Sequence, residues 1–270
     1  MKLSWIALTP DVQNPAALGY RGEFGQTLEL FKELGYEGVE LMVRDPRQLD
    51  TKALVAQIKA SGLEVPQVCS GEVYGEDKVS FTDPDESVRQ EAMARLKAFV
   101  DLAAEFGAQV NIGRARGGYF STVPPETTEA WAEAGFRELA RYAQPKGVLI
   151  GVENVTHLQI NFINTSQEAV EWVKRVNEPN FGVMFDIFHS NLEDVPSVPE
   201  SIRQAGKHIF HVHVADSNRK PPGRGRLDFK TIVAALRDIG YQGYLSGEML
   251  NWPDQDQAIR ETIRALKPLL

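Results

Sequence analysis

Short apolar runs alternate with longer amphipathic runs along the whole chain. Runs rich in β-branched residues predict strands at about 3–8, 38–42, 64–69, 109–113, 149–155, 181–186, 209–214 and 244–249. Amphipathic periodicity predicts helices at about 24–35, 51–62, 86–107, 125–145, 166–177, 195–206, 229–240 and 254–269. The strands lack strict polar alternation, which is typical of strands buried on both faces.

Eight strand–helix alternations in 270 residues predict an α/β protein, a single (β/α)8 TIM barrel that covers residues 1–270 as one domain. A Rossmann or flavodoxin-like fold fits less well, because such folds use fewer strands and no GxGxxG follows the first strand. No linker, low-complexity run or shift in composition divides the chain.

The charge and the cysteine content of the chain limit the binding partners and the cellular location that we expect. A net charge of −8 and a pI near 5.3 argue against a general binder of nucleic acid or of anionic membranes. Cys69 is the one cysteine, so no internal disulfide can form and a reducing, cytoplasmic location is expected. The N-terminal apolar run is too short for a signal peptide, and no run approaches the ~18 apolar residues of a membrane span.

Chemically capable side chains gather at the ends of the last four predicted strands. The active site of a TIM barrel lies at the C-terminal ends of its strands. One candidate metal ligand stands at each of these ends: Glu153, Asp186, His213 and Glu248. Any one of these acids alone is as well explained by a helix cap or an arginine partner. Four at consecutive strand ends favour a metal site, because burying unpaired polar groups costs several kcal/mol.

The oxygen and nitrogen donors of this set include no thiolate. Such a set suits a hard or borderline divalent ion, and we expect one Mn²⁺ or Mg²⁺, with Co²⁺ or Zn²⁺ as rivals.

The stretches "GVENV", "FDIFHSN", "HVHVADSNRKPPGRGRLDF" and "GYLSGEML" resemble the sugar isomerase/epimerase superfamily, the xylose isomerase-like TIM barrels. Within it the chain is most similar to ketose 3-epimerases of the tagatose/psicose type and to hydroxypyruvate isomerase. The resemblance covers the chain in strand order, with its specific motifs between 150 and 250. It implies that the same four side chains bind one Mn²⁺-type ion.

The resemblance also implies roles for neighbouring residues. His189, in the D-x-x-H motif, and Arg219 are expected to contact substrate oxygens around the carbonyl. The alternatives are a capping histidine and a solvated surface cation. His211 is expected to face the same layer of the barrel as a support for the site rather than as a ligand.

A metal that binds the two oxygens of an α-hydroxy carbonyl acidifies the adjacent C–H and stabilises an enediolate. Glu153 and Glu248 are the candidate catalytic acid/base pair, and the predicted function is a metal-dependent carbohydrate isomerase or epimerase. Return of the proton to the opposite face of the same carbon gives epimerisation, and delivery to the neighbouring carbon gives isomerisation. The sequence does not distinguish the two reactions. An inosose dehydratase-like enzyme, a 3-keto-glycoside lyase and a non-catalytic sugar-binding barrel are the alternatives.

Two departures from the ketose 3-epimerase pattern bear on the substrate. Gln159 stands where those enzymes have a second glutamate, and Ala215-Asp216 stands where they have Gly-Glu, which is nearer to the hydroxypyruvate isomerase pattern. Asp216 either orients Arg219 or a metal ligand, or caps a turn.

Arg114 and Arg116 would share a face if the fourth strand continues, and arginine forks suit phosphate or carboxylate. We therefore predict both as substrate-binding residues for a small-molecule carbohydrate that carries an anion. The alternative is a salt bridge to Glu72 or Glu153.

The related nucleases that cleave abasic DNA carry extra histidines on strands two to four. The corresponding stretches here, "VPQVCSGE" and "VNIGRARG", contain none, so a nucleic-acid partner is not expected. Because the relatives associate, a homo-oligomer is expected.

Overall fold

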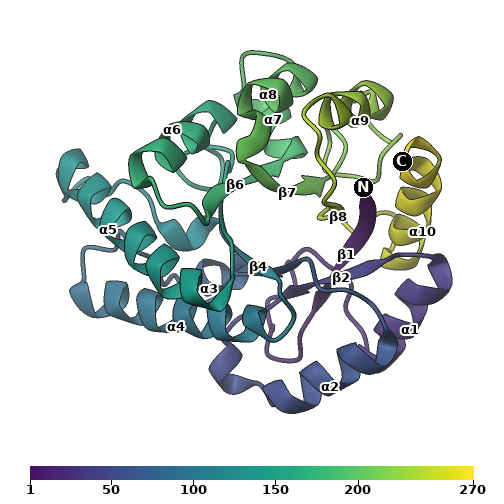
Figure 1. Cartoon of the computed structure of the whole chain (residues 1–270), viewed down its shortest axis with the longest axis horizontal. Coiled ribbons are helices and arrows are strands. Elements are labelled where there is room, and N and C mark those ends of the chain that lie inside the picture. Colours follow the sequence, from purple (N-terminus) through teal and green to yellow (C-terminus); the bar gives the residue numbers. More distant parts are fainter.

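A computed structural model describes all 270 residues of the chain. Eight parallel strands close into a barrel in sequence order, with β8 paired to β1 (Figure 1). The strands are β1 (Lys2–Leu8), β2 (Gly38–Met42), β3 (Gln67–Cys69), β4 (Gln109–Ile112), β5 (Ile150–Glu153), β6 (Phe181–Asp186), β7 (Ile209–Val214) and β8 (Tyr244–Gly247). The predicted TIM-barrel fold is confirmed.

Ten α-helices accompany the barrel, most of them in the outer ring (Figure 1). They are α1 (Phe24–Leu34), α2 (Thr51–Ser61), α3 (Gly71–Gly75), α4 (Glu86–Ala104), α5 (Pro125–Ala143), α6 (Ser166–Val176), α7 (Ile187–Glu193), α8 (Val198–Ala205), α9 (Phe229–Asp238) and α10 (Gln255–Leu266). Five 3₁₀ turns join them: η1 (Pro46–Gln48), η2 (Arg114–Arg116), η3 (Gln144–Lys146), η4 (Gly206–His208) and η5 (Lys267–Leu269).

Local capping chemistry sets several helix boundaries. Thr165 and Glu168 form a capping box at the start of α6, and the Asp228 side chain accepts a hydrogen bond from the Lys230 N–H at the start of α9. Gly35 ends α1 with a φ of 88°, a left-handed conformation that glycine adopts without steric cost.

The structure differs from the prediction at the start of β3 and in two additional short helices, and each difference has a physical reason. β3 begins at Gln67 rather than at residue 64, and Pro66, which lacks an N–H, precedes it. The short helices α3 and α7, both directly after strands, were not predicted, because helices of one or two turns carry too little periodicity to detect.

The main apolar core, a cluster of 65 buried residues, fills the space between the sheet and its surrounding helices, and a second cluster has 6 residues. Within the barrel, buried polar side chains replace this packing beneath the C-terminal ends of the strands, among them Glu40, Gln67 and His211. This polar interior supports the site described next. None of the helices combines the length and apolarity that crossing a membrane requires.

Candidate metal centre and active site

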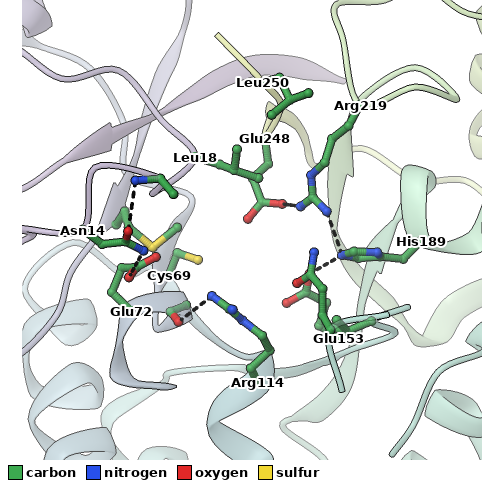
Figure 2. A pocket seen from close by; sticks show the side chains of 15 residues that line it. Asn14, Leu18, Cys69, Glu72, Arg114, Glu153, His189, Arg219, Glu248 and Leu250 are labelled. Carbon is green, nitrogen blue, oxygen red and sulfur yellow. Dashed lines mark hydrogen bonds and ion pairs between the residues drawn. The ribbon is translucent and has the colours of Figure 1, made fainter. Parts of the chain in front are cut away.

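A cavity of about 290 Å³ opens at the C-terminal ends of the strands (Figure 2). Its walls carry Glu153 and Glu248 together with His189 and Arg219, side chains that come from four different segments of the chain. The position agrees with the place where TIM barrels hold their active sites.

The four predicted ligands lie together, with Glu153 and Glu248 in the wall of this cavity. Glu153 and Asp186 are the last residues of β5 and β6, His213 lies near the end of β7, and Glu248 follows β8 directly. All four are buried, and one potential ligand atom from each lies within 4.8 Å of the others. The Nδ1 atom of His213 is 3.8 Å from a Glu248 oxygen and 4.0 Å from an Asp186 oxygen.

The donors present fit a divalent cation. His213 Nδ1 is buried and has no hydrogen-bond partner, although it faces two carboxylates. Burial, followed by the charge of Glu248, raises the pKa of Glu153 to about 8. Burial likewise raises the pKa of Asp186 to about 6, against the opposing effect of Arg219. A bound cation would offset the repulsion between the buried carboxylates, and it would give the unpaired nitrogen of His213 a partner.

Glu40 holds His213 from the opposite side. The Glu40 carboxylate lies 2.8 Å from His213 Nε2 and 2.9 Å from His211 Nε2, and it accepts a hydrogen bond of 2.8 Å from the Gln67 side chain. Glu40 is fully buried, and its two histidine partners outweigh the effect of burial and lower its pKa. The same carboxylate, with Glu248, raises the pKa of His213 to about 10 against the effect of burial.

This arrangement assigns the two ring nitrogens of His213. Nε2–H donates to Glu40, so Nδ1 is the nitrogen that faces the cluster of carboxylates, and its lone pair becomes available to a cation when its proton leaves. His211 supports Glu40, in keeping with its expected place beside the site. No role was predicted for Glu40 from the sequence, and the available signal was a carboxylate within an otherwise apolar strand, "GVELM".

Asn111 on β4 is a further contact of Glu153 that sequence reasoning missed. Its Nδ2 atom donates to a Glu153 oxygen at 3.3 Å, and its Oδ1 accepts from the Ser70 N–H at 2.8 Å. The amide thus limits the orientation of Glu153 from below the cavity.

His189 and Arg219 both line the cavity. His189 lies on α7, where its N–H donates to the Asp186 carboxylate at 3.0 Å. Its Nε2 atom is 3.5 Å from an Arg219 nitrogen and 3.9 Å from a Glu153 oxygen. Arg219 donates to Glu248 at 2.5 Å, and its guanidinium stacks over Phe188.

The backbone of Arg219 is left-handed, with a φ of 57°. This conformation is uncommon for a residue with a side chain and recurs at functional sites. The Arg219 N–H donates to Asp216 O, and Arg219 O accepts from Leu250, so hydrogen bonds on both sides stabilise it.

Arg114 and Arg116 do not share a strand face, because the fourth strand does not continue as far as these residues. β4 ends at Ile112, and both arginines lie in η2, where the turn sends them to different surroundings. Arg114 lines the cavity and forms no ion pair with Glu72 or Glu153 within 4.0 Å. Arg116 is fully buried outside the cavity lining.

The guanidinium of Arg116 is bound entirely by backbone. It donates to the carbonyl oxygens of Phe162, Ile163 and Gly113 at 2.5–2.9 Å. Burial lowers its pKa to about 10. Its contacts give it a structural role in place of the predicted substrate contact.

Asp216 caps the loop that follows β7. Its carboxylate accepts from the N–H groups of Ser217, Gly223 and Leu227, so the turn-capping alternative describes its contacts. Gln159 is exposed and lines the cavity.

Comparison with known proteins agrees with these features. The Xylose isomerase-like TIM barrel family matches residues 28–269. A D-psicose 3-epimerase of Ruminiclostridium cellulolyticum is 30% identical over 83% of this chain and 77% of its own length. A 3-dehydro-D-guloside 4-epimerase of Escherichia coli is 27% identical over 87% of this chain and 91% of its own.

Solved structures show the same fold. An L-ribulose 3-epimerase structure superposes with a TM-score of 0.84 at 22% identity, covering 100% of this chain and 94% of that one. A D-allulose 3-epimerase from Methylomonas sp., in complex with D-allulose, gives 0.83 at 21% identity, with 100% and 98% covered. With its closed eight-strand barrel and the family match along nearly its whole length, the chain belongs to the xylose isomerase-like TIM barrels.

Proposed function

We propose that this protein is a divalent-metal-dependent sugar epimerase or isomerase that transfers a proton at a carbon beside a carbonyl. The observation that carries the proposal is the convergence of four potential ligand atoms on one buried point, with Glu153 and Glu248 of the same cluster also lining the cavity. The relatives, which are 3-epimerases of ketoses and a 4-epimerase of a keto-glycoside, support it.

Glu153, Asp186, His213 and Glu248 would hold the ion. When bound there, a divalent ion supplies Lewis-acid stabilisation of the negative charge that develops on the substrate oxygens. We infer Mn²⁺ from the mixed carboxylate and imidazole donors, with Mg²⁺, Co²⁺ and Zn²⁺ as the alternatives to test by metal content and affinity.

Glu153 and Glu248 are the proposed acid/base pair because they reach the cavity from different strands. One carboxylate takes the proton from the carbon beside the carbonyl, and the C–H electron pair moves onto the carbonyl oxygen. The other, as a carboxylic acid, returns a proton from the opposite face, which inverts that carbon. Arg219 and His189 line the cavity beside these carboxylates, and we propose that they hydrogen-bond the substrate oxygens that gain charge.

Deuterium exchange followed by NMR tests this proposal. The Mn²⁺-loaded protein in D₂O is incubated with ketoses, 3-keto sugars, inososes and their phosphates. We expect deuterium beside a carbonyl, lost on treatment with EDTA, and the labelled carbon then names the reaction. Release of water or of an aglycone would instead identify elimination chemistry. A metal-loaded protein that exchanges no proton with any of these sugars would contradict the proposal.

A further inference from the structure

Glu72 and Arg114 lie on the wall of the cavity opposite His189 and Arg219 (Figure 2). Glu72 stands in the first turn of α3, after β3, and Arg114 opens η2, after β4. Neither belongs to the group of four potential metal ligands. This end of the cavity therefore has a donor and an acceptor that the proposed proton transfer does not use.

Glu72 is held in place by the loop after β1. Asn14 Nδ2 donates to Glu72 Oε2 at 2.9 Å, and Asn14 is itself fixed because its N–H and that of Gln13 donate to Glu76 at 2.8 and 2.7 Å. Glu72 is 3% exposed, yet its second oxygen accepts no hydrogen bond from the chain. The carboxylate is thus prearranged, with one acceptor atom free.

The guanidinium of Arg114 has hydrogen-bond donors that the rest of the chain leaves unused. It makes one hydrogen bond, a long one of 3.3 Å to Gly71 O, and no ion pair within 4.0 Å. A Cβ atom at Gly75 would lie 2.4 Å from Glu72 Oε2 and 3.0 Å from Arg114 Nη2. The Glu72 carboxylate and the Arg114 guanidinium therefore both lie next to Gly75, and the absence of a side chain at this position leaves room for both.

The charges of the site decide which ligand this pair suits. The positive charges of Arg114, Arg219 and a divalent ion would together equal the negative charge of the four carboxylates at the site. These carboxylates are Glu72, Glu153, Asp186 and Glu248. An anionic substituent on the substrate would meet Glu72 next to Arg114. Two neighbouring hydroxyl groups satisfy both side chains, because one hydroxyl donates to the carboxylate and the other accepts from the guanidinium.

We propose that Glu72 and Arg114 form a distal subsite that binds two neighbouring hydroxyl groups at the end of the sugar remote from its reacting carbonyl. This inference rests on the proposed function for the orientation of the sugar. By this proposal the two residues select the length of the sugar and the stereochemistry of its distal carbons. The preferred substrate carries no anionic group at its distal end.

The test compares a ketohexose with a ketotetrose, which keeps the carbonyl end but lacks the distal hydroxyls. Wild type, Arg114→Leu and Glu72→Gln are loaded with Mn²⁺, and both sugar binding by calorimetry and deuterium exchange are measured. Arg224→Leu is the matched control, because Arg224 pairs with Glu261 outside the cavity. Thermal unfolding confirms that each variant is folded.

We expect Arg114→Leu and Glu72→Gln each to weaken ketohexose binding, and to lower kcat/KM for the ketohexose, about 10- to 100-fold, mainly through KM. This factor corresponds to the loss of one charge-assisted hydrogen bond. Values for the ketotetrose and for the Arg224 control should stay near wild type. Equal losses on both sugars, no loss on the ketohexose, or no ketohexose binding by wild type would each overturn the subsite.

Two further results are decisive. Tighter binding of a ketose with a terminal carboxylate or phosphate, abolished in Arg114→Leu, would replace the hydroxyl subsite with an anion site. Ketohexose binding that both variants weaken, in a wild-type protein that exchanges no proton, would support the subsite and contradict the proposed function.

Discussion

His213 presents one ring nitrogen to the candidate metal centre because Glu40 engages the other. Without that carboxylate the ring could rotate, and no acceptor would hold a proton on the nitrogen that faces away from the cavity. The pair also shows why a buried acid and a buried histidine are tolerated here, since each is the hydrogen-bonded partner of the other.

Replacing Glu40 by Gln should weaken Mn²⁺ binding about 10- to 100-fold, because loss of a carboxylate partner behind a ligating histidine reduces its basicity and its fixed orientation. Isothermal titration calorimetry measures the affinity, and nitrogen chemical shifts of His213 report the tautomer. Glu64→Gln, a change to an exposed acid, serves as the control. Unchanged affinity and tautomer in Glu40→Gln would show that Glu40 only fills space.

Glu153→Gln and Glu248→Gln should each lower the rate of substrate deuterium exchange about 10²- to 10⁴-fold, since an amide cannot carry the proton. The comparison must be made in protein whose metal content has been measured, because both residues are candidate ligands. Rates near wild type in metal-loaded variants would exclude these carboxylates as the acid/base pair.

At the scale of elements, two short segments after strands carry much of the site. α7 begins where β6 ends, so Asp186 both caps the helix, by accepting from the His189 N–H, and faces the cluster. η2 turns the chain after β4, which sends Arg114 into the cavity and Arg116 beneath the loop between β5 and α6. The helix cap and the turn thus place side chains that no strand carries.

Arg116→Leu should lower the free energy of unfolding by at least about 1–3 kcal/mol, because buried carbonyl oxygens of that loop lose their donors. Urea unfolding measures the change. Arg114→Leu is the matched control and should be nearly neutral, because its guanidinium is half-buried and makes only one long hydrogen bond. Equal stability of the two variants would show that the Arg116 contacts do not hold the loop.

At the scale of the whole molecule, the buried charges link stability to pH. The pKa of Glu153 is raised to about 8 and that of His213 to about 10, both above their values in an unfolded chain. The folded state therefore binds more protons than the unfolded state between about pH 7 and 9, and stability falls as the pH rises through this range.

The metal-free protein should accordingly lose thermal stability between about pH 7 and 9, at no more than about 1.4 kcal/mol per pH unit for each proton. Added Mn²⁺ should raise the unfolding temperature more at pH 8.5 than at pH 7, because the ion binds the deprotonated ligands. Differential scanning calorimetry with and without metal measures both trends. The slope should be shallower in Glu153→Gln, and a metal-free stability that rises over this range would contradict the assignment.

The amino-acid sequence by itself determined the barrel and the set of candidate ligands. Both depend on short-range patterns, because strand and helix periodicities are local, and closure of eight parallel strands brings the residues at their C-terminal ends together. Glu153 and Glu248 could therefore be named as partners before any contact between them was known.

Only the tertiary structure decided which neighbouring side chains work together. Glu40 and His213 are 173 positions apart and meet across the barrel, while Arg114 and Arg116 are two apart and separate at a turn. Likewise, Asn14 reaches Glu72 from a loop 58 positions away. Sequence spacing predicts which residues share a strand end, but side-chain contacts across the barrel depend on strand register and on irregular turns, which no local periodicity encodes.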